Sequence, residues 1–416
     1  MRMSRPICLR LAYMPETHRP IYMDNHATTR VDPRVVAAML PYFDEKFGNP
    51  HSVHGFGHEA RDAVDAARES IASSLGADSK EIVFTSGATE SNNLSIRGVA
   101  ERDRRRGNHI VSVTTEHKAV LDPLARLGRR GYEVTLLGVE LHPSRRAGWL
   151  DPQAVAHALR DDTCLVSVML VNNEIGIIQP LSQIAAICHD RGAILHCDAT
   201  QAVGKLPVDV ASLDVDLMSF TAHKIYGPKG IGALYVRRRD PIVRLEPQIV
   251  GGGQQEGRRS GTLNVPGIVG FAEALRLCAA EMAEESERLT SLRSQLAAGV
   301  FKQLDDVVLC GPSLEATHDT GTPLRLPGNL NISFSNVDGE ALLLAMGNLA
   351  VSSGAACTST DPGPSHVLLA LGISEEAARS SLRFGLGRFN TREDVEDAIE
   401  RVVFAVRRLR KLAGAI

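Results

Sequence analysis

The sequence lacks a long hydrophobic run. No apolar stretch approaches the ~20 residues that a helix needs to cross a bilayer, so we expect no membrane partner. Residues 1–20 carry four arginines without a sustained apolar segment, which argues against a secretory signal and predicts a disordered N-terminal extension. Internal repeats, low-complexity tracts and blocks of like charge are also missing. These absences favour a globular protein of the cytoplasm.

An excess of one charge is missing as well. Lysine and arginine together number 46 and aspartate and glutamate 49, which leaves a formal net charge of −3. This balance gives no global field that would favour a nucleic acid or a membrane surface. We therefore expect no direct nucleic-acid partner.

Cysteines are few, and their spacing is not typical of a disulfide-bonded framework. The count of seven is odd and no CxxC pair occurs, which argues against disulfides or a metal site and suits a reducing compartment. Cys357 lies in a loop of small polar residues, where a thiol can ionise and reach a substrate; the alternative is an incidental surface cysteine. Five others lie in apolar runs, where cysteine behaves as a small hydrophobe: Cys164, Cys188, Cys197, Cys278 and Cys310.

The stretch 219–230 is the centre of the candidate site. An apolar run over 215–220, broken only by Asp216, predicts a buried strand, and Gly-Pro-Lys-Gly turns the chain back after it. Lys224 follows the strand directly. A sheltered lysine at a strand end loses proton affinity and can form a Schiff base, whereas most loop lysines are simply solvated charges.

A carboxylate ends a second predicted strand. Residues 194–198 form a short apolar run that terminates in Asp198. A strand from 164 and an amphipathic helix over about 181–191 precede it, which together predict a βαβ unit. An acid at one strand end and a lysine at another are what pyridoxal 5'-phosphate (PLP) requires, because the acid keeps the pyridine nitrogen protonated and the lysine carries the aldehyde. Alternatively, Asp198 is a helix cap or a turn residue.

A phosphate site fits the same ligand. Residues 81–85 predict a strand, and Ser-Gly-Ala-Thr-Glu over 86–90 leads into a helix. Small residues at a helix N-terminus leave backbone N–H groups and the positive end of the helix dipole for an anion. The same pattern also suits an ordinary helix cap.

These segments belong to an ordered series of motifs, at residues 85–93, 115–118, 171–176, 198–201, 223–230, 259–262 and 352–359. The series resembles a known family, the cysteine desulfurases among the class V aminotransferase-like PLP enzymes. The resemblance is closest to the housekeeping and nitrogen-fixation branch that supplies sulfur for iron–sulfur clusters, and it runs from about residue 21 to about 400.

The resemblance implies an α/β fold of the PLP-dependent transferase fold type I. Its large domain has a mostly parallel mixed sheet flanked by helices, and a smaller α+β domain follows. We assign residues 1–20 to the extension, 21–35 to an N-terminal segment packing with the small domain, 36–275 to the large PLP-binding domain and 276–416 to the small domain with the catalytic cysteine loop. The length of 416 residues agrees with two domains.

The resemblance also implies the cofactor contacts. Lys224 carries PLP, Asp198 meets the ring nitrogen, and His117 stacks on the ring and handles protons. Asn173 and Gln201 are hydrogen-bond partners of the cofactor. The phosphate contacts are Ala88, Thr89, Thr221 and His223. Thr262 reaches the phosphate of the other subunit, which implies a homodimer.

The implied reaction converts L-cysteine to L-alanine. Arg383 and Asn173 bind the substrate, since a guanidinium is a natural clamp for a carboxylate, and Arg388 is taken as structural. Lys224 moves the α-proton, while Cys357 attacks the substrate sulfur and becomes a persulfide. The acceptor is an iron–sulfur scaffold or a thiolation relay, and Cys357 can transiently ligate a cluster during transfer.

Other functions remain open at this stage. A selenocysteine lyase, an aminotransferase or another class V lyase would share Lys224 and Asp198, although transamination needs no thiol. A docking protein for sulfur relay that has lost catalysis is a further alternative. The chain ends soon after its last predicted helix, where members that deliver sulfur to the scaffold often carry a longer tail, so the acceptor is not determined.

Overall fold

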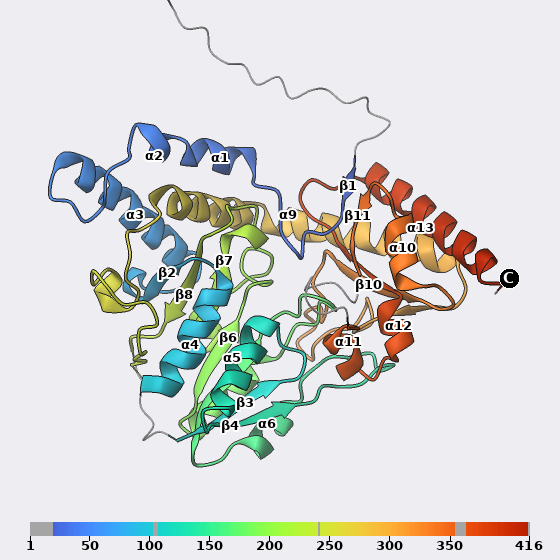
Figure 1. The fold of residues 1–416 in the computed structure, drawn as a ribbon, viewed down its shortest axis with the longest axis horizontal. Coiled ribbons are helices and arrows are strands. Elements are labelled where there is room, and N and C mark those ends of the chain that lie inside the picture. The colour runs from blue at the N-terminus through green and yellow to red at the C-terminus, as the bar shows by residue number, and fades with distance from the viewer. Residues whose placement is uncertain (1–19, 103–106, 240–241, 354–362, 415–416) are drawn as a thin grey trace, which may run out of the picture.

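A seven-stranded sheet forms the centre of the larger part of the molecule (Figure 1). The computed structural model describes residues 20–102, 107–239, 242–353 and 363–414. The strands lie in the order β2-β8-β7-β6-β5-β3-β4. Their bounds are β2 Ile82–Thr85, β3 His109–Val113, β4 Glu133–Leu137, β5 Thr163–Met169, β6 Ile194–Asp198, β7 Leu217–Thr221 and β8 Gly232–Val236.

The sheet is parallel except at β8, which pairs antiparallel with both β2 and β7. Every strand but the edge strand β4 is buried along its whole length. Burial on both faces explains why these strands read as continuous apolar runs and not as alternating ones. The parallel strands end at one edge of the sheet, so Thr85, Asp198 and Thr221 meet there.

Helices cover both faces of this sheet. On one face α4 and α5 pack through a core that includes Leu94, Val120 and Leu124. The opposite face is covered by α3, α7 and α9, whose buried residues include Val64, Ile184 and Phe271 in a second core. The helices of this part are α1 Pro33–Met39, α2 Pro41–Asp44, α3 Gly55–Ser73, α4 Ala88–Arg102, α5 Lys118–Gly128, α6 Pro152–Ala158, α7 Leu181–Asp190 and α8 Val210–Leu213.

A smaller antiparallel sheet, in the order β12-β13-β10-β9, forms the C-terminal part. Its core also contains Ile21 and Met23 from the N-terminal segment, where β1 pairs with β11 in parallel. The remaining elements are β1 Ile21–Tyr22, α9 Val265–Gln303, β9 Val307–Leu309, β10 Asn329–Phe334, α10 Gly339–Ala345, β11 Leu349–Ala350, β12 Ser352–Ser353, α11 His366–Ala370, α12 Glu375–Arg379, β13 Ser381–Gly385 and α13 Arg392–Leu412.

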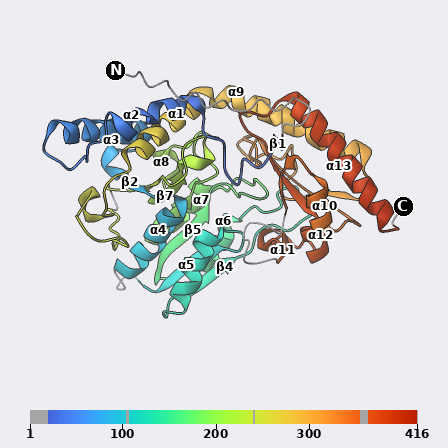
Figure 2. The ribbon, with the colours of Figure 1, turned by 45° about the horizontal axis from the view of Figure 1, so that its top comes forward.

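The helix α9 connects the two parts (Figures 1 and 2). It is 39 residues long, and its first half packs in the core of the large part while Leu292, Leu296 and Val300 pack in the core of the small one. The α/β class and the βαβ unit β5-α7-β6 are confirmed. The predicted boundary at 275/276 falls inside this continuous helix, so the exact division into domains stays a prediction. In the part of the chain that the structure describes, no helix is long and apolar enough to span a bilayer.

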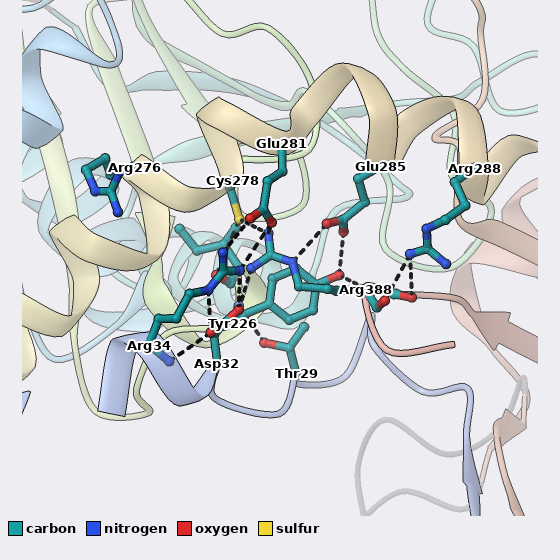
Figure 3. A network of polar contacts seen from close by, with 12 residues as sticks. Thr29, Asp32, Arg34, Tyr226, Arg276, Cys278, Glu281, Glu285, Arg288 and Arg388 are labelled. Carbon is teal, nitrogen blue, oxygen red and sulfur yellow. Dashed lines mark hydrogen bonds and ion pairs between the residues drawn. The ribbon is translucent and has the colours of Figure 1, made fainter. Parts of the chain in front are cut away.

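A cluster of charged residues ties the small part to the large one (Figure 3). Arg388, just after β13, is 9% exposed and contacts Asp32 at 2.9 Å and Glu285 of α9 at 3.0 Å. Its guanidinium also lies 4.3 Å from the centre of the Tyr226 ring. Arg388 therefore joins the N-terminal segment, α9 and the loop after β7, as expected for a structural residue.

Because of the same cluster, we expect the free energy of unfolding of the protein to fall at acid pH. Hydrogen bonds from Arg34, and a further one from Arg388, hold the pKa of Asp32 well below its ordinary value. The stabilisation is complete above the unfolded-state pKa of about 4. It is lost as the pH falls below that value, because the unfolded chain then binds a proton that the folded chain does not.

We expect Arg388→Met to lower the free energy of unfolding by about 3 kcal/mol, because the change removes one cationic partner from the buried Asp32 and from Glu285. Chemical denaturation at pH 7 measures the loss. Arg392→Met is the matched control, since Arg392 pairs with Glu396 on the surface of α13 at 73% exposure and such pairs contribute within about 0.5 kcal/mol. Equal effects of the two changes would show that the cluster around Arg388 does not hold the parts together.

Candidate active site

A cavity of about 610 Å³ lies at the carboxyl ends of the parallel strands. The N-terminal segment, the sheet and the small part of the molecule all contribute to its walls. The residues predicted for the site that line it are Ala88, Thr89, His117, Asn173, Asp198, Gln201, Thr221, His223, Lys224 and Arg383. The fold therefore brings together ten of the twelve residues selected from the sequence.

Lys224 ends a tight turn, Ala222–Lys224, directly after β7. Its Nζ donates hydrogen bonds to the backbone carbonyls of His26 and Ala27, both at 2.6 Å. Gly227 completes the turn, and a Cβ at that position would lie only 2.8 Å from the Cβ of Ala222. The glycine is therefore needed to bring the chain back so closely behind the lysine.

Asp198 is the buried last residue of β6. Its Oδ2 accepts a hydrogen bond from Asn92 of α4 at 2.7 Å, and its Oδ1 accepts one from the backbone N–H of Thr200 at 3.0 Å. The carboxylate accepts both bonds, and together they fix its orientation. The role of Asn92 was not predicted, because nothing in the local sequence distinguishes it from its neighbour Asn93.

His117 is both the cap of α5 and a wall of the cavity. Its Nδ1 accepts the backbone N–H of Ala119 at 3.0 Å, so in the neutral ring the proton belongs on Nε2. Enclosure by the surrounding protein lowers the pKa of His117, Lys224 lowers it further, and Asp198 opposes the effect. The imidazole is therefore neutral at pH 7.

The helix α4 opens on the cavity with Ala88 and Thr89 in its first turn. Its unpaired N–H groups and dipole suit an anion there. The Oγ1 of Thr221 donates to the carbonyl of Ile231 at 3.0 Å, and Nδ1 of His223 lies 3.2 Å from Oγ1 of Thr28. Burial, followed by the charge of Lys224, lowers the pKa of His223 to about 4.

Two further cavity residues are held by hydrogen bonds. Gln201 donates from Nε2 to the carbonyl of His26 at 2.9 Å and accepts at Oε1 from Lys205 at 2.6 Å. Arg383 of β13 donates from Nη1 to the backbone carbonyl of Asn173 at 3.2 Å. The guanidinium thus stands where the small part of the molecule meets the large one. Lys205 was not predicted as a site residue, because it does not directly follow any of the predicted strands.

Two predicted residues remain, and only one of them, Thr262, lies within the described residues. Thr262 is exposed in the segment before α9 and does not line this cavity. Cys357 belongs to 354–362, outside the described residues. Ser352, shortly before that segment, is a wall residue. The five cysteines predicted to be inert, from Cys164 to Cys310, are all buried. Within the described ranges no group of three or more potential ligands could hold a metal ion.

The arrangement defines a class of protein. A lysine and a hydrogen-bonded carboxylate stand at the ends of neighbouring strands, and a helix N-terminus opens beside them in the same cavity. This is the set of groups that a ring with a protonated nitrogen, an aldehyde and a phosphate requires. An α/β fold with such a site is that of a PLP-dependent enzyme.

Comparison with known proteins gives the family. The model of the aminotransferase class-V family matches residues 21–397. A cysteine desulfurase IscS of Anaeromyxobacter sp. (strain K) is 53% identical over 395 residues, covering 95% of this chain and 94% of the relative. The IscS of Escherichia coli (strain K12 / DH10B) is 52% identical over 397 residues with the same coverage. A solved NifS-like protein is 37% identical with a TM-score of 0.84, covering 94% of this chain and 100% of its own.

The chain therefore belongs to the aminotransferase class-V family, in its cysteine desulfurase group. The cofactor of this family is PLP, and the cavity fits it. Asp198 is a buried carboxylate that can accept a pyridine N–H, since it already accepts hydrogen bonds from Asn92 and Thr200. Lys224 can carry the aldehyde, and the first turn of α4 can receive the phosphate.

We expect His223 to titrate near pH 4 in cofactor-free protein, well below the ordinary value of about 6.5. Histidine resonances followed by NMR between pH 3 and 8 report the midpoint, and His223→Gln assigns the signal. Lys224→Met should raise that midpoint, since the lysine charge opposes protonation of the ring. A midpoint near 6.5 for His223 would contradict the burial described here.

Proposed function

We propose that this enzyme is a cysteine desulfurase, which converts L-cysteine to L-alanine and forms a persulfide on Cys357. The observation that carries the proposal is the meeting of Lys224, Asp198 and Arg383 in one cavity. The first two suit the cofactor, and the third suits an amino-acid carboxylate. The similarity over 95% of the chain to curated cysteine desulfurases supports the same reaction.

Different residues of the cavity bind the substrate, hold the cofactor and transfer protons. Bound PLP supplies the electron sink that makes the α-proton of the substrate removable. Arg383 binds the substrate carboxylate with help from Asn173. Lys224 Nζ takes and returns the α-proton, and the neutral His117 holds a second proton on Nε2. Gln201, Thr221 and His223 hold the cofactor in place with the first turn of α4.

The sulfur leaves through Cys357. Its thiolate Sγ forms an S–S bond with the substrate sulfur while the C–S bond of the substrate breaks. The carbon then takes a proton and becomes the methyl group of L-alanine, so that one thiol and L-cysteine yield one persulfide and L-alanine. The persulfide passes its sulfur to an acceptor, for which we propose an iron–sulfur scaffold or a thiolation relay, in the cytoplasm.

We also propose that the enzyme is a homodimer. An exposed apolar surface on α1, α2 and the start of α3 supports this, because monomers rarely present large apolar patches. Its residues, named here the N-terminal apolar patch, are Val36, Leu40, Phe43, Phe47, Val53 and Phe56. The segment that carries Thr262 lies on the same side of the molecule (Figure 1). A partner seated there agrees with a role of Thr262 at the phosphate of the other subunit.

Alanine and sulfide release from L-cysteine in the presence of a reductant tests the reaction. We expect equal amounts of both from the wild type and loss of more than about 99% of turnover in Cys357→Ala, because a covalent step is removed. The variant should retain the visible absorption of bound PLP, whereas Lys224→Ala should lose it. Cys8→Ala, in the predicted extension, is the matched control. Undiminished release by Cys357→Ala would favour a lyase or an aminotransferase with the same cofactor.

Analytical ultracentrifugation tests the dimer. The wild type should sediment as two chains of 44.9 kDa each, and Phe43→Glu with Phe47→Glu should shift it to one chain, since both charges would be buried in the interface. Leu344→Glu on α10 is the matched control, because Leu344 is also an exposed apolar residue, at 82% against 62% for Phe43 and 64% for Phe47, but lies outside the N-terminal apolar patch. A wild-type monomer at micromolar concentration would refute the proposal.

A further inference from the structure

Asp24 holds the guanidinium that is assigned to the substrate. It follows β1 in the N-terminal segment and lines the cavity. Its Oδ1 accepts a hydrogen bond from Nη2 of Arg383 at 3.0 Å and another from Oγ of Ser352 at 2.7 Å. Nη2 also donates to Oγ of Ser352 at 2.9 Å. The three side chains thus form a closed triangle in which both N–H groups of Nη2 are engaged.

The ion pair compensates a buried charge. The side chain of Arg383 is 3% exposed and that of Asp24 is 20% exposed. A guanidinium so far from water is costly unless an anion accompanies it. Asp24 supplies that anion from within the chain, and it does so in the cavity that the substrate must enter.

The position of Asp24 is fixed by the backbone. Gly385 donates its N–H to the carbonyl of Met23 at 2.7 Å and accepts the N–H of Asn25 at 3.0 Å, so the chain on both sides of Asp24 is bonded to β13. This is the strand that carries Arg383 two residues earlier. A Cβ at Gly385 would lie 2.9 Å from the N atom of His26. The backbone of Asp24 therefore cannot withdraw from Arg383 when a ligand arrives.

We propose that Asp24 is an internal competitor for Arg383, which weakens the binding of amino-acid carboxylates and so limits retention of L-alanine. The inference rests on the role of Arg383 given above. Substrate and product carry the same carboxylate, and in the cavity that carboxylate must share one guanidinium with a second anion. Two carboxylates at such a short distance repel each other. Interactions of this kind shift an ionisation equilibrium by about one to three powers of ten. Asp24 acts through Arg383 and takes no part in bond making.

The test measures ligand affinity without turnover. Calorimetric titration of the PLP-loaded protein gives dissociation constants for L-alanine and for L-alaninol, which has the same amine and methyl group but a hydroxymethyl group in place of the carboxylate. Asp24→Asn retains an acceptor oxygen for Arg383 and Ser352 but removes the charge. We expect it to bind L-alanine about tenfold more tightly and L-alaninol unchanged, with a KM for L-cysteine lowered by a similar factor. Asp24→Glu keeps the charge and should bind L-alanine within about threefold of the wild type.

Each outcome decides the question. If Asp24→Asn binds L-alanine as weakly as the wild type or more weakly, Asp24 only orients Arg383 and the inference is wrong. If both variants tighten binding equally, the charge is not the cause, and the inference is wrong as well. Arg383→Gln separates this failure from that of the proposed function: unchanged affinity for L-alanine in that variant would remove Arg383 as the carboxylate clamp. Retained PLP absorbance and an unchanged thermal midpoint verify that each variant is folded.

Discussion

Ionised groups that are removed from water need a partner, and two arginines of the small part find theirs in distant parts of the chain. Arg383 of the small part pairs with Asp24 of the N-terminal segment. Arg388 pairs with Asp32 and with Glu285 of α9. Because one unpaired buried charge costs several kcal/mol, these contacts keep the two parts of the molecule in one relative position. The geometry of the cavity depends on that position.

The N-terminal segment is the element on which most of these contacts converge. The carbonyl of His26 accepts from both Lys224 and Gln201. Thr29 accepts the backbone N–H of Tyr226 at its Oγ1, and it donates that hydroxyl to the carbonyl of His223. A stretch of about six residues thus fixes the lysine turn of the large part, while Asp24 fixes the arginine of the small part. Lys224 and Arg383 are therefore positioned by the same short segment.

The strands and the lysine turn could be predicted because their causes are local. A strand buried on both faces must be apolar throughout, and that pattern is visible for β5, β6 and β7. The turn after β7 needs glycine and proline at fixed places, so Lys224 could be located without a fold. Parallel strands end at one edge of a sheet, which is why Asp198 and Lys224 could be expected in one site. The N-terminal contacts could not be predicted, since Asp24 and Arg383 are separated by most of the chain.

The sequence alone determined the βαβ unit, the burial of five cysteines and the residue types of a PLP site, because each depends on hydrophobic pattern, turn chemistry or side-chain reactivity. The fold class came from the sequence as well, through the family that its motifs resemble. Only the tertiary structure decided that Asn92 orients Asp198, that Lys205 holds Gln201, and that Asp24 occupies Arg383. The physical reason is the same in all three cases. A hydrogen bond or an ion pair depends on distances of about 3 Å between atoms, and only the folded chain brings those atoms so close.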